Sequence, residues 1–221
     1  MKLITTLRSL TLIAILGVLA GCATSRSEIR LNSPAAASAD AVTPNGKTVV
    51  IRSVTDERVF EQSPKDPSTP SLGFEGSAQA SADTKSRAIG RKRNGFGKAM
   101  GDVLLQSGQT VESVIRENLK AAFEQAGYQV KTEEAAGASP LLVDVHVKQF
   151  WAWFQPGFWA LTLKSNISTD LTLSGTQSPT TISVHAEETR QMATEGAWME
   201  IVEKALKEYR AEVTTKSKTF P

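Results

Sequence analysis

The chain has a single cysteine and only two histidines among its 221 residues. One cysteine cannot form an intramolecular disulfide, so stability in an oxidising compartment has to come from a packed core. The histidines, His146 and His185, fall at polar positions of expected strands, and no cysteine or carboxylate joins them at a ligand spacing. The pattern favours solvated histidines over a metal or acid–base pair, and we expect no cofactor.

Recognisable catalytic motifs are absent as well. The sequence has no G-x-S-x-G and no H-E-x-x-H. Two pairs of adjacent carboxylates, Glu133-Glu134 and Glu187-Glu188, would point to opposite faces of a strand and could not act together on one bond. We therefore expect a protein that is not an enzyme. An enzymatic function would require the two histidines to bind a metal.

The N-terminal segment has the layout of an export signal. Lys2 and Arg8 precede an apolar stretch from Leu10 to Ala20. This stretch is shorter than the roughly 20 residues that cross a bilayer comfortably, so we interpret residues 1–21 as a cleaved signal peptide. Its removal leaves 200 residues, enough for one ordinary domain.

Leu19-Ala20-Gly21-Cys22 resembles the bacterial lipobox. The resemblance implies cleavage after Gly21 and multiple acylation of Cys22, hence a permanent membrane anchor. By the sorting behaviour of such lipoproteins, Ala23 in place of Asp implies the periplasmic face of the outer membrane. Cys22 is also the only cysteine, and it stands where the acceptor must be.

Overall charge gives no argument for a polyanionic partner. The signal carries two of the 25 basic residues, so the mature chain has 23 residues of each sign. A balanced protein has no general attraction for nucleic acid, and we expect no nucleic-acid partner.

Local patterns predict one α+β domain over 47–213, made of a mainly antiparallel sheet with two helices packed on one face. Residues 22–46 lack any hydrophobic period and predict a lipidated, flexible tether that reaches about 25 to 30 Å. A first strand is expected at 47–55, a helix between the cap Thr110 and Gly127, and a last helix from Thr194. We expect residues 214–221 to be a frayed tail.

The centre of the predicted fold is an aromatic hairpin after Leu141. Val143, Val145 and Val147 alternate with polar residues, and six aromatic residues follow between positions 150 and 159. A three-residue turn, 155–157, would keep Trp151, Trp153 and Trp159 on the face of the valines, whereas a two-residue turn would require a bulge. We prefer the three-residue turn, which sets Phe154 opposite Phe158.

This register places Phe150, Phe154 and Phe158 on the opposite face of the hairpin. Either a helix or a second copy covers them as ordinary core, or they form a contact for lipid, a hydrophobic ligand or a protein. The first alternative is favoured, because clustered aromatic residues usually pack inward.

Two further segments are candidates for function. A proline-rich stretch, 63–71, has no core-forming residue and is interpreted as a mobile surface insertion. Six basic residues surround Asn94-Gly95, a strong hairpin signal, and could contact lipid phosphates, anionic cell-wall polymer or an acidic partner. A solvated loop is favoured over such a contact. These residues are Lys85, Arg87, Arg91, Lys92, Arg93 and Lys98.

The order of elements resembles the YajG family of small, largely uncharacterised bacterial lipoproteins. The lipobox carries the resemblance, together with Gln125-Ala126-Gly127-Tyr128-Gln129-Val130 and Leu141-Leu142-Val143-Asp144-Val145-His146-Val147 before the aromatic hairpin. The family supplies no reaction and no catalytic residues. We expect a membrane-tethered accessory or assembly factor that binds an envelope protein or an amphipathic, lipid-like ligand. The alternative is a structural lipoprotein that contacts anionic cell-wall polymer through the basic hairpin.

Overall fold

A computed structural model describes residues 25–35, 42–74, 76–94, 96 and 98–221. In this part of the chain, eight strands form one sheet with the order β1-β4-β3-β6-β2-β5, and β7 and β8 continue from the other side of β6. The strands are β1 (Ser27–Ile29), β2 (Thr48–Asp56), β3 (Ala88–Arg93), β4 (Ala99–Leu105), β5 (Gln129–Val130), β6 (Leu141–Pro156), β7 (Leu161–Leu173) and β8 (Thr180–Arg190). The helices are α2 (Gly76–Gln79), α3 (Ala82–Arg87), α4 (Val111–Gln125) and α5 (Glu195–Ser217), with a 3-10 turn at Glu133–Ala135.

The sheet is mixed, so the α+β class holds, and the prediction of a mainly antiparallel sheet is not confirmed. The pairs β3–β4, β6–β7 and β7–β8 are antiparallel, whereas β1–β4, β2–β5, β2–β6 and β3–β6 are parallel. Antiparallel neighbours here follow each other along the chain. The parallel pairs join strands that are distant in sequence and need long crossovers, which a local pattern does not reveal.

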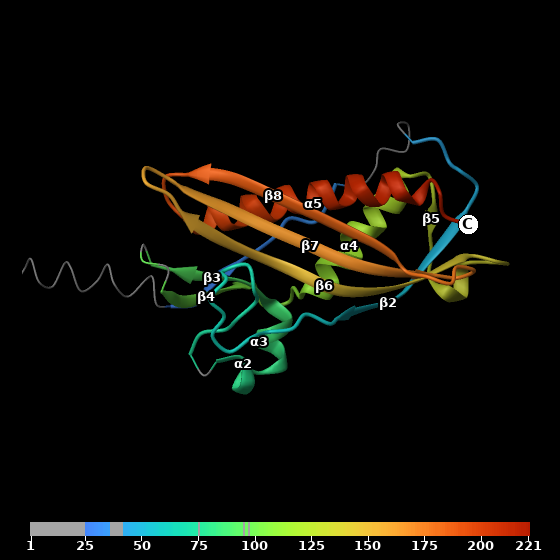
Figure 1. The fold of residues 1–221 in the computed structure, drawn as a ribbon. Helices are drawn as coiled ribbons and strands as arrows, with labels where there is room; N and C mark the ends of the chain where they lie inside the picture. Colours follow the sequence, from blue (N-terminus) through green and yellow to red (C-terminus); the bar gives the residue numbers. More distant parts are fainter. Residues whose placement is uncertain (1–24, 36–41, 75, 95, 97) are drawn as a thin grey trace, which may run out of the picture.

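Helices α4 and α5 pack on one face of the sheet, as predicted (Figure 1). Thr110 caps α4 through a bond from the Ser113 amide to its side chain, and Thr194 caps α5 in the same way from Ala197. Gly127 follows α4 at φ 88°, a conformation in which a Cβ would meet the Thr43 carbonyl oxygen at 2.5 Å.

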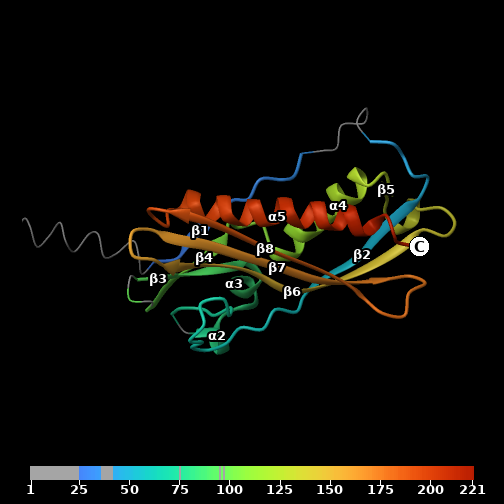
Figure 2. The same cartoon turned by 45° about the horizontal axis from the view of Figure 1, so that its top comes forward.

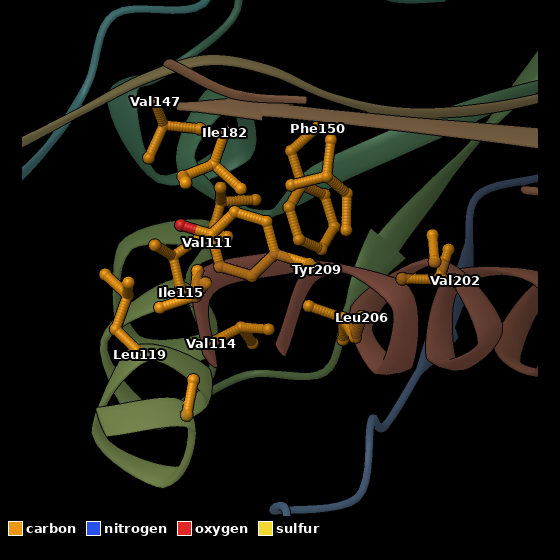
Figure 3. Packing of buried hydrophobic residues seen from close by; sticks show 14 of the residues in the cluster. Val111, Val114, Ile115, Leu119, Val147, Phe150, Ile182, Val202, Leu206 and Tyr209 are labelled. Atoms are coloured by element: carbon orange, nitrogen blue, oxygen red, sulfur yellow. The ribbon is translucent and has the colours of Figure 1, made fainter. Parts of the chain in front are cut away.

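The main core lies between this helical layer and the sheet. Figure 3 shows Phe150 of β6 and Tyr209 of α5 close together, with side chains of α4 completing the cluster. The buried hydroxyl of Tyr209 lies 2.8 Å from Thr169 Oγ1, so its polar end is paired inside the core. Burial raises the pKa of this hydroxyl well above its usual value.

A β-bulge at Lys148 changes the expected register of the aromatic hairpin. Val147 opposes Thr169, but Gln149 opposes Ser168, so Lys148 is an extra residue on β6. From this point the even positions Phe150 and Phe154 continue the buried face of the valines, and the odd positions turn to the other face. The prediction that Trp151 and Trp153 share the valine face is therefore wrong.

A second, smaller cluster covers the opposite face of the sheet. It contains Trp151 and Trp153 of β6 with Leu72, Ala88 and Leu104, and Phe60 packs against it. The proline-rich stretch lies over this cluster, because the indole Nε1 of Trp151 donates to the Pro67 carbonyl at 3.1 Å. In Figure 2, the chain around α2 and α3 lies on the side of the sheet away from α5. The prediction of a mobile insertion at 63–71 is wrong.

The C-terminal residues are part of the fold. Helix α5 continues to Ser217, and Phe220 is buried with its ring centroid 6.3 Å from that of Phe123. The ammonium of Lys47 donates to the carbonyl of Phe220 at 2.9 Å. The prediction of a frayed tail at 214–221 is therefore wrong.

One buried guanidinium fastens the second layer to the sheet. The side chain of Arg58 is fully buried, and its Nη1 donates to the carbonyls of Ala88 at 2.5 Å and Phe150 at 3.0 Å. Its Nη2 donates to Lys85 O and to Asp56 Oδ2. Arg58 thus connects the segment that follows β2 with three other elements, namely β3, β6 and α3.

Arg58→Met should lower the free energy of unfolding by about 2–4 kcal/mol, because it removes a buried cation and leaves the carbonyls of Ala88 and Phe150 buried without their donor. Urea denaturation measures the change. Arg52→Met is the matched control: Arg52 also pairs with a carboxylate, that of Asp144, but its side chain is 43% exposed. The control should cost less than about 1 kcal/mol. Equal costs for the two variants would contradict the assignment of Arg58 as the fastening residue.

Candidate functional surface

The predicted acylation site, Cys22, lies outside the described residues, but the chain shortly after it is well placed in the sheet. Strand β1 pairs in parallel with β4, Ser27 against Val103, and Ile29 and Leu31 are buried. The prediction of a flexible tether over 22–46 is therefore wrong for these residues. Among the residues that the structure describes, no helix combines the length and apolar character needed to cross a membrane.

The entry of the chain into β1 is held by a buried carboxylate. Asp102 of β4 is fully buried, and its Oδ2 accepts from Arg26 Nε at 3.1 Å while its Oδ1 accepts from the Gly73 amide at 2.7 Å. The guanidinium of Arg26 also lies 4.6 Å from the centre of the Phe74 ring, a cation–π contact. Lys92 of β3 donates from Nζ to the Ser25 carbonyl at 3.2 Å. These contacts hold Ser25 and Arg26 against β3 and β4.

The three phenylalanines predicted to share a face have different environments. Phe150 and Phe154 are buried in the main core, and Phe154 packs edge-on to Trp198 with centroids 6.5 Å apart. Phe158 lies in the connection between β6 and β7, which spans 157–160, and is 90% exposed. Phe154 opposes Leu163 and not Phe158. Core packing is therefore the correct alternative for the first two residues only.

The exposed part of the aromatic hairpin is a pair at its tip. Trp159 is 85% exposed, and its ring stands perpendicular to that of Phe158 with centroids 4.8 Å apart. Sequence patterning assigned Trp159 to the core face, because it continued the alternation of the strand. The connection 157–160 interrupts that alternation, so the residues at the tip do not alternate between the two faces of the sheet.

Three connections meet at the same end of the sheet, and we call them together the loop end: 94–98, 157–160 and 191–194. Strand β3 runs parallel to β6, and β8 ends opposite the start of β7, with Arg190 against Leu161. Figures 1 and 2 show these connections at one end of the molecule. Large exposed hydrophobic side chains gather there, namely Phe96, Phe158, Trp159 and Met192.

The basic residues do not form one solvated stripe. Lys85 and Arg87 belong to α3 and not to the hairpin, and Arg87 is paired with Glu28 and Asp83. Arg91 donates to Met100 O, and burial lowers the pKa of both Arg91 and Arg93. Of the six, only Lys98 is exposed. These side chains serve mainly the local structure.

The basic hairpin itself is confirmed, with a longer turn than predicted. Strands β3 and β4 pair with Arg93 opposite Ala99, so the connection spans 94–98. The side-chain oxygen of Asn94 accepts from the amides of Phe96 and Lys98, which organises the described part of this turn. Gly95 lies outside the described residues.

The two histidines are not brought together. His146 lies on β6 and His185 on β8, with β7 between these strands. His146 contacts Glu57 at 2.6 Å, and His185 contacts Asn166 at 2.5 Å. Bonds from Lys148 and then His146 lower the pKa of Glu57. The residues that the structure describes contain no cluster of three side chains that could hold a metal ion.

The larger hollows of the surface are open, and their walls mix polar and apolar residues. One of about 610 Å³ lies beside Lys47, Ser139 and Pro221, near the C-terminus. Another of about 500 Å³, between β2 and α4, is bordered by Arg52, Arg116 and Glu133 among others. Neither resembles the enclosed apolar cavity that usually holds a lipid-like molecule.

Comparisons with known proteins give a likeness in fold alone. No model of a known family matches the chain, and neither does any curated protein. Protein XCC0632 of the DUF330 family, from Xanthomonas campestris, is 10% identical with a TM-score of 0.45, and the match covers 88% of this chain and 93% of that one. The hypothetical protein CT253 from Chlamydia trachomatis is 7% identical with a TM-score of 0.39, over 76% and 96% of the two chains.

Asp102→Asn should release the entry into β1, since the amide keeps an acceptor for Gly73 but loses the charge that holds Arg26. We expect amide hydrogen exchange at Ser27–Leu31 to accelerate about tenfold, with little change in the helices. Asp83→Asn is the control, because Asp83 pairs with Arg87 on the surface. Unchanged exchange at Ser27–Leu31 would show that Asp102 does not hold this segment.

Proposed function

We propose that this protein is a lipoprotein of the bacterial envelope, acylated on Cys22 and held at the periplasmic face of the outer membrane. The lipobox-like Leu19-Ala20-Gly21-Cys22 carries the proposal. The fixed entry of the chain into β1 supports it, because an anchor at Cys22 would hold a folded domain directly. Membership of the YajG family belongs to this proposal and rests on the resemblance of the sequence. Besides the lipobox, the residues that carry this resemblance lie at the end of α4, in β5 and in β6.

We further propose that the protein acts by contact, as an accessory or assembly factor, and not as an enzyme. The exposed pair Phe158 and Trp159 supports a contact with an envelope protein or an amphipathic, lipid-like molecule, since exposed apolar patches usually mark interaction sites. Exposed residues support such a surface contact better than the open hollows support a buried ligand.

The alternative, contact with anionic cell-wall polymer through the basic residues, loses its main support. Contact with an anionic polymer needs several exposed cations on one surface. Of the six candidates only Lys98 is exposed, and Arg87 already has two carboxylate partners. We therefore retain the apolar contact as the proposed function.

Cys22→Ala should abolish both processing after Gly21 and acylation. Expressed in a bacterium with a lipoprotein export system, the wild-type protein should fractionate with the outer membrane, and intact mass should show the added acyl chains. The variant should lack that mass and be retained with its signal peptide. A wild-type protein that has a free Cys22 thiol would contradict the proposal.

Ala23→Asp should redirect the acylated protein to the inner membrane, if residue 23 acts as the sorting signal that the lipobox resemblance implies. Density separation of the two membranes measures the distribution. Ala23→Ser is the control and should leave the protein in the outer membrane. Identical distributions of the Asp variant and the wild type would contradict the proposed localisation.

A further inference from the structure

We propose that the loop end is a second membrane contact, at which Phe158 and Trp159, with Phe96 and Met192, insert into the interface of the leaflet that holds the acyl chains of Cys22. The proposal rests on the proposed acylation for the choice of leaflet. The insertion itself depends only on the exposed side chains. It gives the domain a fixed orientation on the membrane.

The direction of the chain places the anchor at this end. Strand β1 runs parallel to β4, and β4 begins directly after the connection 94–98. The first described residue, Ser25, contacts Lys92, next to the last residue of β3. Ser25 therefore lies beside the loop end and far from the connection between β7 and β8.

The length of the intervening chain limits how far the domain can move from the membrane. Cys22 and Ser25 are three residues apart, which spans at most about 11 Å even when fully extended. A 25-residue flexible tether would have let the domain turn freely. The bonds from Arg26 to Asp102 and from Lys92 to Ser25 leave only this short link between the acyl chains and the sheet.

The side chains of the loop end suit an interface between water and lipid. Phe96 is 99% and Met192 69% exposed, so both carry apolar surface into solvent at an energetic cost. Tryptophan favours the headgroup region, where its ring is buried and its N–H stays hydrated. Phe74, 62% exposed and stacked on Arg26, adds a further aromatic ring beside the entry into β1.

Lys98 is an exposed cation at this end, but the cations of β7 and β8 near the loop end are paired, which favours apolar insertion over electrostatic attraction. Arg190 pairs with Glu188 at 3.1 Å and with Glu200 at 2.5 Å. Lys164 lies 3.4 Å from Glu187. A contact of this kind should change little with ionic strength, unlike one made by free cations on anionic lipid.

Intrinsic fluorescence tests the insertion without a label. Among the four tryptophans, Trp151, Trp153 and Trp198 are buried and Trp159 is exposed. The mature acylated protein is reconstituted in vesicles of phosphatidylethanolamine with a smaller share of phosphatidylglycerol, whose acyl chains carry bromine as a quencher. We expect bromine to quench part of the emission. In Trp159→Phe, which keeps an apolar ring, the quenchable part should disappear. Emission of the wild-type protein that bromine leaves unchanged would overturn the proposal.

The non-acylated chain, residues 22–221 with Cys22→Ala, separates insertion from anchoring. Its partition onto the same vesicles should fall about tenfold or more in the double variant Phe158→Ser with Trp159→Ser, and should hardly change with salt. Val59→Ser is the matched control, because Val59 is 75% exposed but lies outside the loop end. Equal partition of the double variant and the control would overturn the insertion and leave the acylation of Cys22 unaffected. Failure of acylation would appear instead in the intact mass of the wild-type protein.

A photocrosslinking residue at position 158 distinguishes lipid from protein in living cells. Adducts with phospholipid support the proposal, and the same residue at Gln177, in the connection between β7 and β8, should give none. Gln177 is exposed at the other end of the sheet. An adduct with a protein in place of lipid would overturn the proposal and assign the loop end to a partner.

Discussion

Strand β6 lies between β2 and β3 on one side and β7 on the other, and the extra residue Lys148 decides which of its side chains reach each face. Before the bulge the valines face the helices. After it, Phe150 and Phe154 take over that face, and Trp151 and Trp153 turn to the other. A slip of one residue exchanges the two faces of a strand, so both hydrophobic layers depend on this bulge.

The second layer exists because two large indoles need cover on the far side of the sheet. The chain between β2 and β3 provides it, with Leu72 and Phe60 against the tryptophans and a bond from Trp151 to the Pro67 carbonyl. This segment has little apolar surface of its own. Polar contacts therefore help to hold it in place, among them the bonds of the buried guanidinium of Arg58 to Ala88 and Phe150 and that of the Gly73 amide to Asp102. The prolines of 63–71 restrict the backbone of a segment that packs over the tryptophans, and they do not mark a mobile insertion.

Burial of the inner aromatic residues leaves the loop end as the surface with the clearest functional meaning. Phe158 and Trp159 remain outside because the connection between β6 and β7 projects beyond the helical layer that covers Phe150 and Phe154. The same end receives the chain from Cys22, through β1 and the contact of Arg26 with Asp102. The entry of the chain into β1 and the exposed aromatic side chains thus lie together, and this placement supports the proposed contact with the membrane.

Sequence patterns were enough to predict the α+β class, a first strand at 47–55, the helices α4 and α5 with their caps, and the hairpins, because periodicity and capping are local properties. Only the tertiary structure decided that β2 pairs with β6, that β1 joins β4, and that Phe150 and Phe154 are core while Phe158 is exposed. Parallel pairing joins distant segments, and a single bulged residue reverses an alternation that otherwise looks continuous. Neither leaves a local signal, since both depend on which surface the folded chain can cover.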